Sequence, residues 1–264
     1  MIIIKVGGGK ELNLDEILVD FAGIKEKKIL VHGANYEAKQ LSEKLGNPPK
    51  MVTSVSGHVS RRTDRTTLEI LEMAYSGLVN KRIVEKLQAL GINAVGLTGM
   101  DGRIWEGERK PFIKIRDNGK SRIIRDDYTG KVEKINTELL TLLLDNNYVP
   151  VLTIPGISYE NEAINLDNDR AIAVMGGALK AEKIIILIEE PGVLRDIDDK
   201  SSVVQKIRKE EIDSYIKLTE ARMRKKMLGV KEALDSGVKQ IHIADGRICK
   251  PITAALHGGG TLIR

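Results

Sequence analysis

Short apolar runs alternate with amphipathic segments along most of the chain. Runs rich in β-branched residues predict strands at 2–6, 28–31, 92–97, 149–154, 183–188, 240–244 and 261–263. Apolar residues spaced three and four apart predict helices at 13–22, 35–45, 136–147, 168–180 and 222–236, and two helices across 65–90 that separate near Gly77. Asn13 is the expected N-cap of the first helix, because its side chain can accept a hydrogen bond from an early backbone amide.

This alternation predicts the fold class. Strands that alternate with helices are typical of a parallel sheet covered on both faces, so we predict an α/β fold, a three-layer αβα sandwich with a mainly parallel central sheet. Residues 103–135 depart from the pattern, and their short β-prone pieces with the Asn118-Gly119 turn predict hairpins. We expect two lobes, 1–160 and 161–264, with the Pro-Gly turns at 155–156 and 191–192 as lobe junctions or active-site loops.

Composition excludes several classes of protein. The 264 residues are 42% hydrophobic with a net charge of +5, which excludes intrinsic disorder. One cysteine, Cys249, excludes a disulfide scaffold. There is no apolar run long enough to span a membrane, and the first residues are typical of a strand rather than a signal peptide, so we expect a cytoplasmic protein with no membrane partner. Aromatic residues are 3% of the chain, which argues against nucleic acid stacking on aromatic rings.

Two predicted strands end in small residues. Lys5 precedes Gly7-Gly8-Gly9, and His32 precedes Gly33-Ala34-Asn35 at the start of a helix. Backbone amides at such loops and helix starts bind anions, so the two segments predict facing phosphate sites. An ordinary turn with a lysine at the edge of a strand remains the alternative. The P-loop motif is absent.

Four further segments concentrate charged or amide side chains. Residues 57–65 hold three arginines and one aspartate, which predicts either carboxylate recognition or a solvated basic face. Residues 161–169 hold more amides and carboxylates than helix capping requires. Residues 222–226 place four cations at the start of a helix, which opposes the helix dipole unless an anion lies there. We interpret Asp245-Gly246 as a structural turn, with Arg247 paired to an acid.

In this order along the chain, these motifs resemble the amino-acid kinase family, and specifically its acetylglutamate-kinase branch. The resemblance covers nearly all 264 residues and rests on the ordered set Lys5-Val6-Gly7-Gly8, His32-Gly33, Arg61-x-Thr63-Asp64, Asn80-Lys81, Asn165 with Asp169, Met223-x-x-Lys226 and Asp245-Gly246-Arg247. It implies a fold with an acyl-acceptor lobe followed by a nucleotide lobe. The implied reaction is ATP-dependent phosphorylation of a side-chain carboxylate to an acyl phosphate, with Mg²⁺ held mainly through the phosphates and no dedicated metal site.

The resemblance also implies a role for individual residues. Lys5 and Lys226 would stabilise the transferring phosphoryl group, and Asp169 would hold both lysines in place. The implied acceptor-binding residues are Ala34, Asn35, Tyr36, Arg61, Arg62, Asn165 and Asp167. The implied nucleotide-binding residues are Gly7, Gly8, Glu189, Gly192 and Leu194.

Departures from the acetylglutamate-kinase pattern suggest a particular branch. Gly33-Ala34-Asn35 stands where three glycines are usual, and Arg61-Arg62-Thr63-Asp64 where Arg-Val-Thr-Asp is usual. These departures resemble the kinases that act on aminoadipate or glutamate attached to LysW, a small acidic amino-group carrier protein. Arginines at 58–65 and the basic strands of 114–125 would suit such a partner.

Three functions therefore stay open at this point. They are a kinase of carrier-linked aminoadipate or glutamate in lysine and arginine biosynthesis, a plain acetylglutamate kinase, and a nucleotide-binding storage or regulatory protein without turnover. The resemblance further implies a homodimer through the helices around 65–90.

Overall fold

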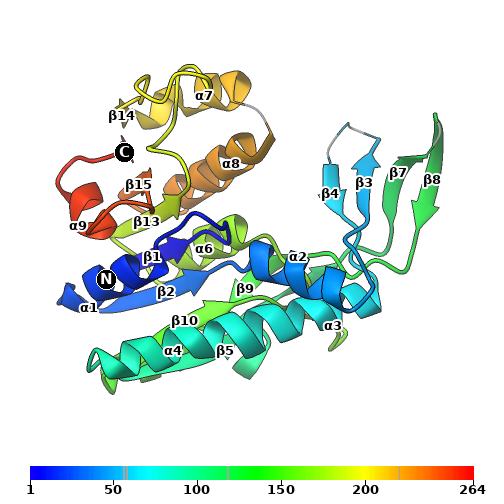
Figure 1. Ribbon diagram of the computed structural model, residues 1–264, viewed down its shortest axis with the longest axis horizontal. Helices are drawn as coiled ribbons and strands as arrows, with labels where there is room; N and C mark the ends of the chain where they lie inside the picture. Colours follow the sequence, from blue (N-terminus) through cyan, green and yellow to red (C-terminus); the bar gives the residue numbers. More distant parts are fainter. Residues whose placement is uncertain (56, 58, 118, 220) are drawn as a thin grey trace.

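An eight-stranded sheet forms the centre of the computed structural model (Figure 1). The structure describes residues 1–264 except 56, 58, 118 and 220, and it leaves out the side chains of 221 and 222. The order of strands is β14-β16-β15-β13-β1-β2-β10-β5. Their bounds are β1 Ile2–Val6, β2 Lys28–His32, β5 Ala94–Thr98, β10 Val149–Thr153, β13 Lys183–Ile188, β14 Lys206–Ile207, β15 Gln240–Asp245 and β16 Thr261–Ile263. The predicted α/β fold with a mainly parallel sheet is confirmed, since only the β15–β16 pairing within this sheet is antiparallel.

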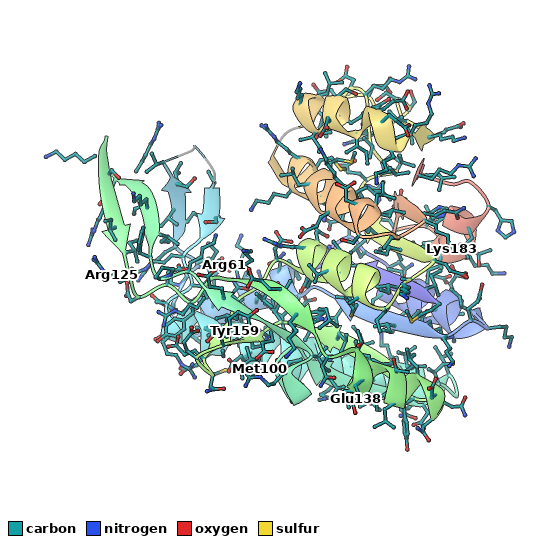
Figure 2. All side chains as sticks on the ribbon, turned by 180° about the vertical axis from the view of Figure 1, so that it is seen from behind. Arg61, Met100, Arg125, Glu138, Tyr159 and Lys183 are labelled. Atoms are coloured by element: carbon teal, nitrogen blue, oxygen red, sulfur yellow. The ribbon has the colours of Figure 1, made fainter. Side chains whose placement is uncertain are left out.

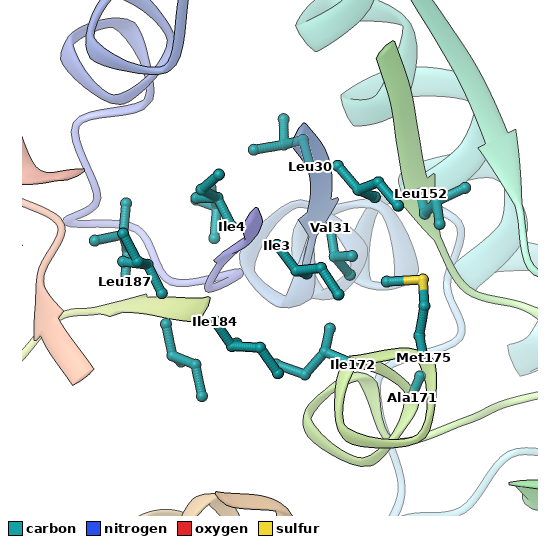
Figure 3. Packing of buried hydrophobic residues seen from close by; sticks show 14 of the residues in the cluster. Ile3, Ile4, Leu30, Val31, Leu152, Ala171, Ile172, Met175, Ile184 and Leu187 are labelled. Carbon is teal, nitrogen blue, oxygen red and sulfur yellow. The ribbon is translucent and has the colours of Figure 1, made fainter. Parts of the chain in front are cut away.

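Strand β1 lies in the middle of this sheet and pairs in parallel with β2 on one side and β13 on the other. All five of its residues are buried, Lys5 included. Ile3 and Ile4 pack among apolar side chains of β2, β13, β10 and helix α6 (Figure 3). The strand is therefore held rigidly from both edges and both faces.

Helices cover both faces of the sheet. In Figure 1 α1 and α4 lie in front, and Figure 2 shows α6 and α8 on the opposite face together with α5, on which Glu138 is labelled. The bounds are α1 Leu14–Gly23, α2 Asn35–Lys44, α5 Thr137–Asp145, α6 Asn168–Ala178, α7 Ile212–Leu218, α8 Ala221–Asp235 and α9 Pro251–Leu256. Asn13 caps α1 as predicted, by accepting a hydrogen bond from the Glu16 amide.

The helical segment 65–90 does not break at Gly77, contrary to the prediction. It runs as α3 (Arg65–Glu72), a π-helix η1 (Met73–Val79) and α4 (Asn80–Ala89). Helical dihedral angles continue through both junctions, and a side chain on Gly77 would meet open space. The π-turn is a bulge that keeps the helix continuous while turning its faces.

Two smaller sheets are formed by strands that lie between residues 51 and 164. One has the order β12-β11-β6-β9 and the other β4-β3-β7-β8, which stands away from the main body in Figure 1. The predicted hairpins within 103–135 are present, although Asn118 itself lies outside the described residues. The bounds are β3 Met51–Ser54, β4 Val59–Arg61, β6 Trp105–Arg109, β7 Ile113–Asp117, β8 Lys120–Ile124, β9 Gly130–Ile135, β11 Gly156–Ser158 and β12 Ala163–Ile164.

Several short elements lack a sequence signal and were not predicted: β3, β4, β11, β12, β14, α7, α9 and the 3₁₀ turns η2 (Asp101–Arg103) and η3 (Lys209–Glu211). Helix α9 illustrates the reason, because its start is capped from a distance. The Asp20 carboxylate in α1 accepts from the amides of Ile252 and Thr253 at 2.6 and 2.8 Å.

No helix of the described residues is long and apolar enough to cross a membrane.

Candidate functional site

Three buried charges from three elements meet at the end of β1. One oxygen of the Asp169 carboxylate, in the first turn of α6, forms an ion pair with Lys5 Nζ of β1 at 2.9 Å. Its other oxygen lies 2.8 Å from Lys226 Nζ of α8. The side chain of Lys5 is 7% exposed, that of Asp169 13% and that of Lys226 16%. Two cations share one anion, so the cluster has a net positive charge.

The pKa shifts follow from this sharing. Burial alone would raise the pKa of Asp169, but the charges of Lys5 and Lys226 outweigh it and lower that pKa below its ordinary range. Burial and the nearby Lys5 charge lower the pKa of Lys226 to about 8. Burial also acts against the charge of Lys5, yet its contact with Asp169 leaves the pKa of Lys5 raised. The cluster is thus prepared for an incoming anion, which would stabilise both lysines.

A close approach of two helices brings Lys226 to Asp169. Gly229 lies three residues after Lys226, and a side chain there would stand 3.0 Å from the backbone oxygen of Asp169. Helix α8 therefore packs directly on the first turn of α6. Sequence analysis missed Gly229, although a glycine in an otherwise strong helical stretch is a usable signal of close packing.

The two glycine-containing loops pack against each other as predicted. A side chain on Gly8 would lie 2.5 Å from the Asn35 amide nitrogen, and one on Gly33 would lie 2.8 Å from the Gly8 amide nitrogen. Among the described residues the amides of Gly8, Gly9 and Asn35 have no hydrogen-bond partner, which leaves them available to an anion. Gly7 differs, because its amide donates to the Leu187 carbonyl at 3.0 Å. Gly7 thus belongs to the sheet, and the free donors begin at Gly8.

Arg61 ends β4 beside a segment with several hydrogen bonds to distant parts of the chain. Thr63 donates its amide to the buried Asp127, and its hydroxyl accepts from the Asn165 side chain at 3.0 Å. Asn165 also donates its backbone amide to Tyr128. Arg61 has no ion-pair partner among the described residues. Its guanidinium, labelled in Figure 2, is therefore the free cation of this segment.

Three other predicted acceptor residues make contacts within this chain. Arg62 pairs with Asp126 at 2.5 Å. Asp167 is the N-cap of α6, where it accepts from the amides of Asp169 and Arg170. The Tyr36 amide donates to the Gly8 carbonyl, and its ring lies 5.8 Å below the Lys10 ammonium. These contacts stabilise the structure around the cluster and the glycine loop. Ala34 is buried at the start of α2, where that helix meets the glycine loop.

The other three predicted nucleotide residues, Glu189, Gly192 and Leu194, lie in the segment after β13. The Glu189 carboxylate rests against Gly9 and accepts from the Glu11 amide at 2.9 Å, so it supports the glycine loop. Gly192 packs against the hydroxyl of Thr261, which accepts from the next amide along the chain. Leu194 bridges to Val203. This segment therefore joins the glycine loop to the far edge of the sheet.

Two other motifs have structural roles, as predicted for His32 and Asp245. The His32 ring is buried beneath the loop and contacts Asn80, and burial lowers the pKa of His32 to about 4, so it is neutral at physiological pH. Arg247 makes two 2.8 Å contacts with Asp245. Lys81, which follows Asn80, donates to the Gly96 carbonyl.

The carboxylate at the centre of the cluster is not free to bind a metal. Asp169 is engaged by two lysines, and the residues that the structure describes contain no group of three or more metal-binding side chains. This arrangement fits a divalent cation that is held by the phosphates of a bound nucleotide rather than by the protein.

Comparison with known sequences gives consistent matches over the full chain. Residues 1–245 match the model of the amino acid kinase family. A Thermus thermophilus protein named [LysW]-aminoadipate kinase is 47% identical, with both chains covered completely. A Deinococcus radiodurans protein of the same name is 49% identical over the whole of this chain and 91% of its own. A Saccharolobus islandicus [LysW]-aminoadipate/[LysW]-glutamate kinase is 36% identical over 100% and 99% of the two chains.

Solved structures share the fold. Neisseria gonorrhoeae N-acetylglutamate synthase superposes with a TM-score of 0.79 at 23% identity, covering 99% of this chain and 58% of that one. Giardia lamblia carbamate kinase bound to AMP-PNP superposes with a TM-score of 0.69 at 15% identity, covering 99% and 97%. With the family match over most of its length, the chain is a phosphotransferase and belongs to the amino acid kinase family.

Proposed function

We propose that the chain phosphorylates the side-chain carboxylate of aminoadipate or glutamate attached to the carrier protein LysW, with ATP as the phosphoryl donor. The observation that carries this proposal is the Lys5–Asp169–Lys226 cluster, in which two lysines share one carboxylate at the end of the strand that leads into the free amides of the glycine loop. The full-length relatives named as kinases of LysW-linked substrates support the choice of acceptor. In this proposal residues 1–160 bind the acceptor and 161–264 bind the nucleotide.

The cluster suits transfer between two anions. The acceptor carboxylate is already ionised near neutral pH, so no general base is needed. Lys5 and Lys226 would offset the negative charge of the phosphoryl group during its transfer, while the amides of Gly8 and Gly9 would fix its position. Asp169 cannot act as a base while both its oxygens contact lysines, so its role is to hold them. Mg²⁺, when bound, would offset the charge of the nucleotide phosphates.

The small outer sheet supports a carrier protein as partner. A hollow of about 510 Å³ opens beside it, and the lining includes five basic and two acidic side chains: Lys50, Arg62, Arg116, Arg122, Arg125, Asp117 and Asp126. Arg62 pairs with Asp126, and Arg122 with Asp117. The charge that remains is positive, and it would attract an acidic protein whose tethered amino acid reaches Arg61.

The ion pairs change the set of residues that we propose for docking. Arg65, expected to meet the partner, pairs with Glu69 one helical turn away. Since Arg62 is also paired within the chain, the cations that line the hollow without an ion pair are Lys50, Arg116 and Arg125 among the described residues. His58, at the start of the predicted basic segment, lies outside the described residues.

We also propose a homodimer that forms through the continuous helix 65–89. Met73 and Leu78 on this helix are 54% and 37% exposed, so the helix offers apolar side chains to a second copy of the chain. Light scattering of the purified protein tests this point.

The acceptor is tested by trapping the acyl phosphate with hydroxylamine. The enzyme with ATP and Mg²⁺ should form hydroxamate with LysW-linked aminoadipate or glutamate far faster than with acetylglutamate. Efficient turnover of acetylglutamate alone would contradict the carrier proposal and favour an acetylglutamate kinase. ATP binding without turnover of any of the three would contradict an acyl kinase.

Removing either catalytic lysine should lower kcat. By analogy with the loss of one oxyanion donor, Lys5→Ala or Lys226→Ala should reduce kcat by roughly 10²–10³-fold, with a smaller change in KM. Lys225→Ala, which removes the neighbouring cation on the same helix, is the matched control and should leave kcat within about twofold. A folded Lys5→Ala enzyme with near-normal kcat would falsify the assignment.

The rate should depend on the charge of Lys226. Its pKa of about 8 means that the free enzyme loses this proton as the pH rises, so kcat/KM for ATP should fall above pH 8. Asp169→Asn removes the anion that raises the Lys226 pKa and should shift this alkaline limb to lower pH. Lys226→Arg should abolish the limb, because arginine stays charged. A limb that is the same in all three enzymes would show that another group titrates.

Charge reversal on the outer sheet should weaken use of the carrier. Arg116→Glu with Arg125→Glu should raise KM for the LysW-linked substrate several-fold and flatten its dependence on salt, since exposed charges act through screened, long-range attraction. KM for ATP should not change. Lys25→Glu with Lys239→Glu reverses two exposed cations elsewhere and should have no effect on either KM. Equal effects of both double variants would contradict docking at this surface.

A further inference from the structure

Tyr75 is a buried phenol on the acceptor side of the site that the reaction described above does not use. It lies in the π-helix η1, is 4% exposed, and donates its hydroxyl to Asn35 Oδ1 at 2.8 Å. The two residues are 40 positions apart in the chain. An α-helix with a π-turn turns its later faces relative to its earlier ones, and such turns occur often at functional sites.

Tyr75 lies near charged groups that the proposal assigns to acceptor binding and to phosphoryl transfer. Arg61 and Lys5 both act on the phenol electrostatically, and the Ala34 backbone contributes a hydrogen bond to it. Burial outweighs these effects and raises the pKa of Tyr75, so the phenol stays protonated and can donate. A protonated hydroxyl of fixed direction gives Asn35 a defined partner.

This contact determines which end of the Asn35 amide is free. Because Oδ1 accepts from Tyr75, the Nδ2 group is left without a partner among the described residues. Asn35 begins α2, and its backbone nitrogen lies against Gly8 in the phosphate-binding loop. An amide NH₂ group in this place is a hydrogen-bond donor for a carbonyl or carboxylate oxygen.

We propose that Tyr75 is a positioning residue for the acceptor and that it acts through Asn35, whose Nδ2 donates to a carbonyl or carboxylate oxygen of the acceptor. The proposal rests on the proposed function, since it needs an acyl acceptor in this half of the site. Without the Tyr75 hydroxyl, the Asn35 amide can turn over and present Oδ1, an acceptor that repels the substrate oxygen. Loss of one such hydrogen bond corresponds to about a 3- to 15-fold weaker interaction.

A double-mutant cycle tests this mechanism. Tyr75→Phe and Asn35→Ala should each raise KM for the acceptor about 3- to 15-fold, with kcat and the KM for ATP changed less than about twofold. Tyr75→Phe in the Asn35→Ala background should add nothing, because the group through which it acts is gone. The proposal would be overturned if the two substitutions multiply in their effect on KM for the acceptor. It would also be overturned if KM for the acceptor and KM for ATP rise equally.

Two further variants separate positioning from folding. Asn35→Asp keeps an oxygen for Tyr75 but removes the donor and adds charge, so it should raise KM for the acceptor at least as much as Asn35→Ala. Tyr148→Phe removes the hydroxyl of an exposed tyrosine outside the site and should be neutral. Thermal melting of each variant checks folding, and an unchanged acceptor KM in folded Asn35→Asp contradicts the proposal.

Wild-type turnover distinguishes failure of this inference from failure of the proposed function. A wild-type enzyme that phosphorylates none of the carboxylate acceptors contradicts both. If the wild-type enzyme is active but Tyr75→Phe and Asn35→Ala leave KM for the acceptor unchanged, only the role of Tyr75 and Asn35 is contradicted.

Discussion

The ion cluster of Lys5, Asp169 and Lys226 imposes the main constraint on this molecule. Burying three charges is costly unless they pair with good geometry, and here one carboxylate must serve two ammonium groups. The constraint explains the packing around the cluster. Strand β1 is fixed in the centre of the sheet, α6 begins with a capping aspartate beside Asp169, and Gly229 lets α8 approach. An unpaired member would leave a buried charge, so fold and site depend on the same contacts.

The central sheet could be predicted because its strands are apolar on both faces. Runs such as that of β13 between Ile184 and Ile188 are typical of buried parallel strands, and their order along the chain then predicts the layers. The short strands β3 and β4 could not be predicted, because most of their residues are exposed or half-buried and lack a clear apolar face. The π-helix was missed for a related reason: Tyr75 falls on a helical apolar stripe and has the same spacing as a core residue.

The candidate site was predicted unevenly. The resemblance to the amino-acid kinases implied that Lys5, Asp169 and Lys226 belong together, and the structure places them in contact. The sequence did not indicate that the Gly7 amide is used by the sheet, because that bond reaches Leu187. Arg62 likewise has its partner, Asp126, 64 residues away. The net charge of a short segment does not show ion pairs with residues far away in the chain. The net charge of residues 57–65 therefore overestimated how many of their cations are unpaired.

The continuous helix 65–89 joins two parts of the molecule that lie far apart in the chain. Its first turns pack near α2, and its last turns pack on β5 and β10 of the central sheet. Helical dihedral angles continue through the π-turn between them, so both ends belong to one unbroken element. Helix α2, which begins at Asn35, and the edge strand β5 therefore pack against opposite ends of the same helix.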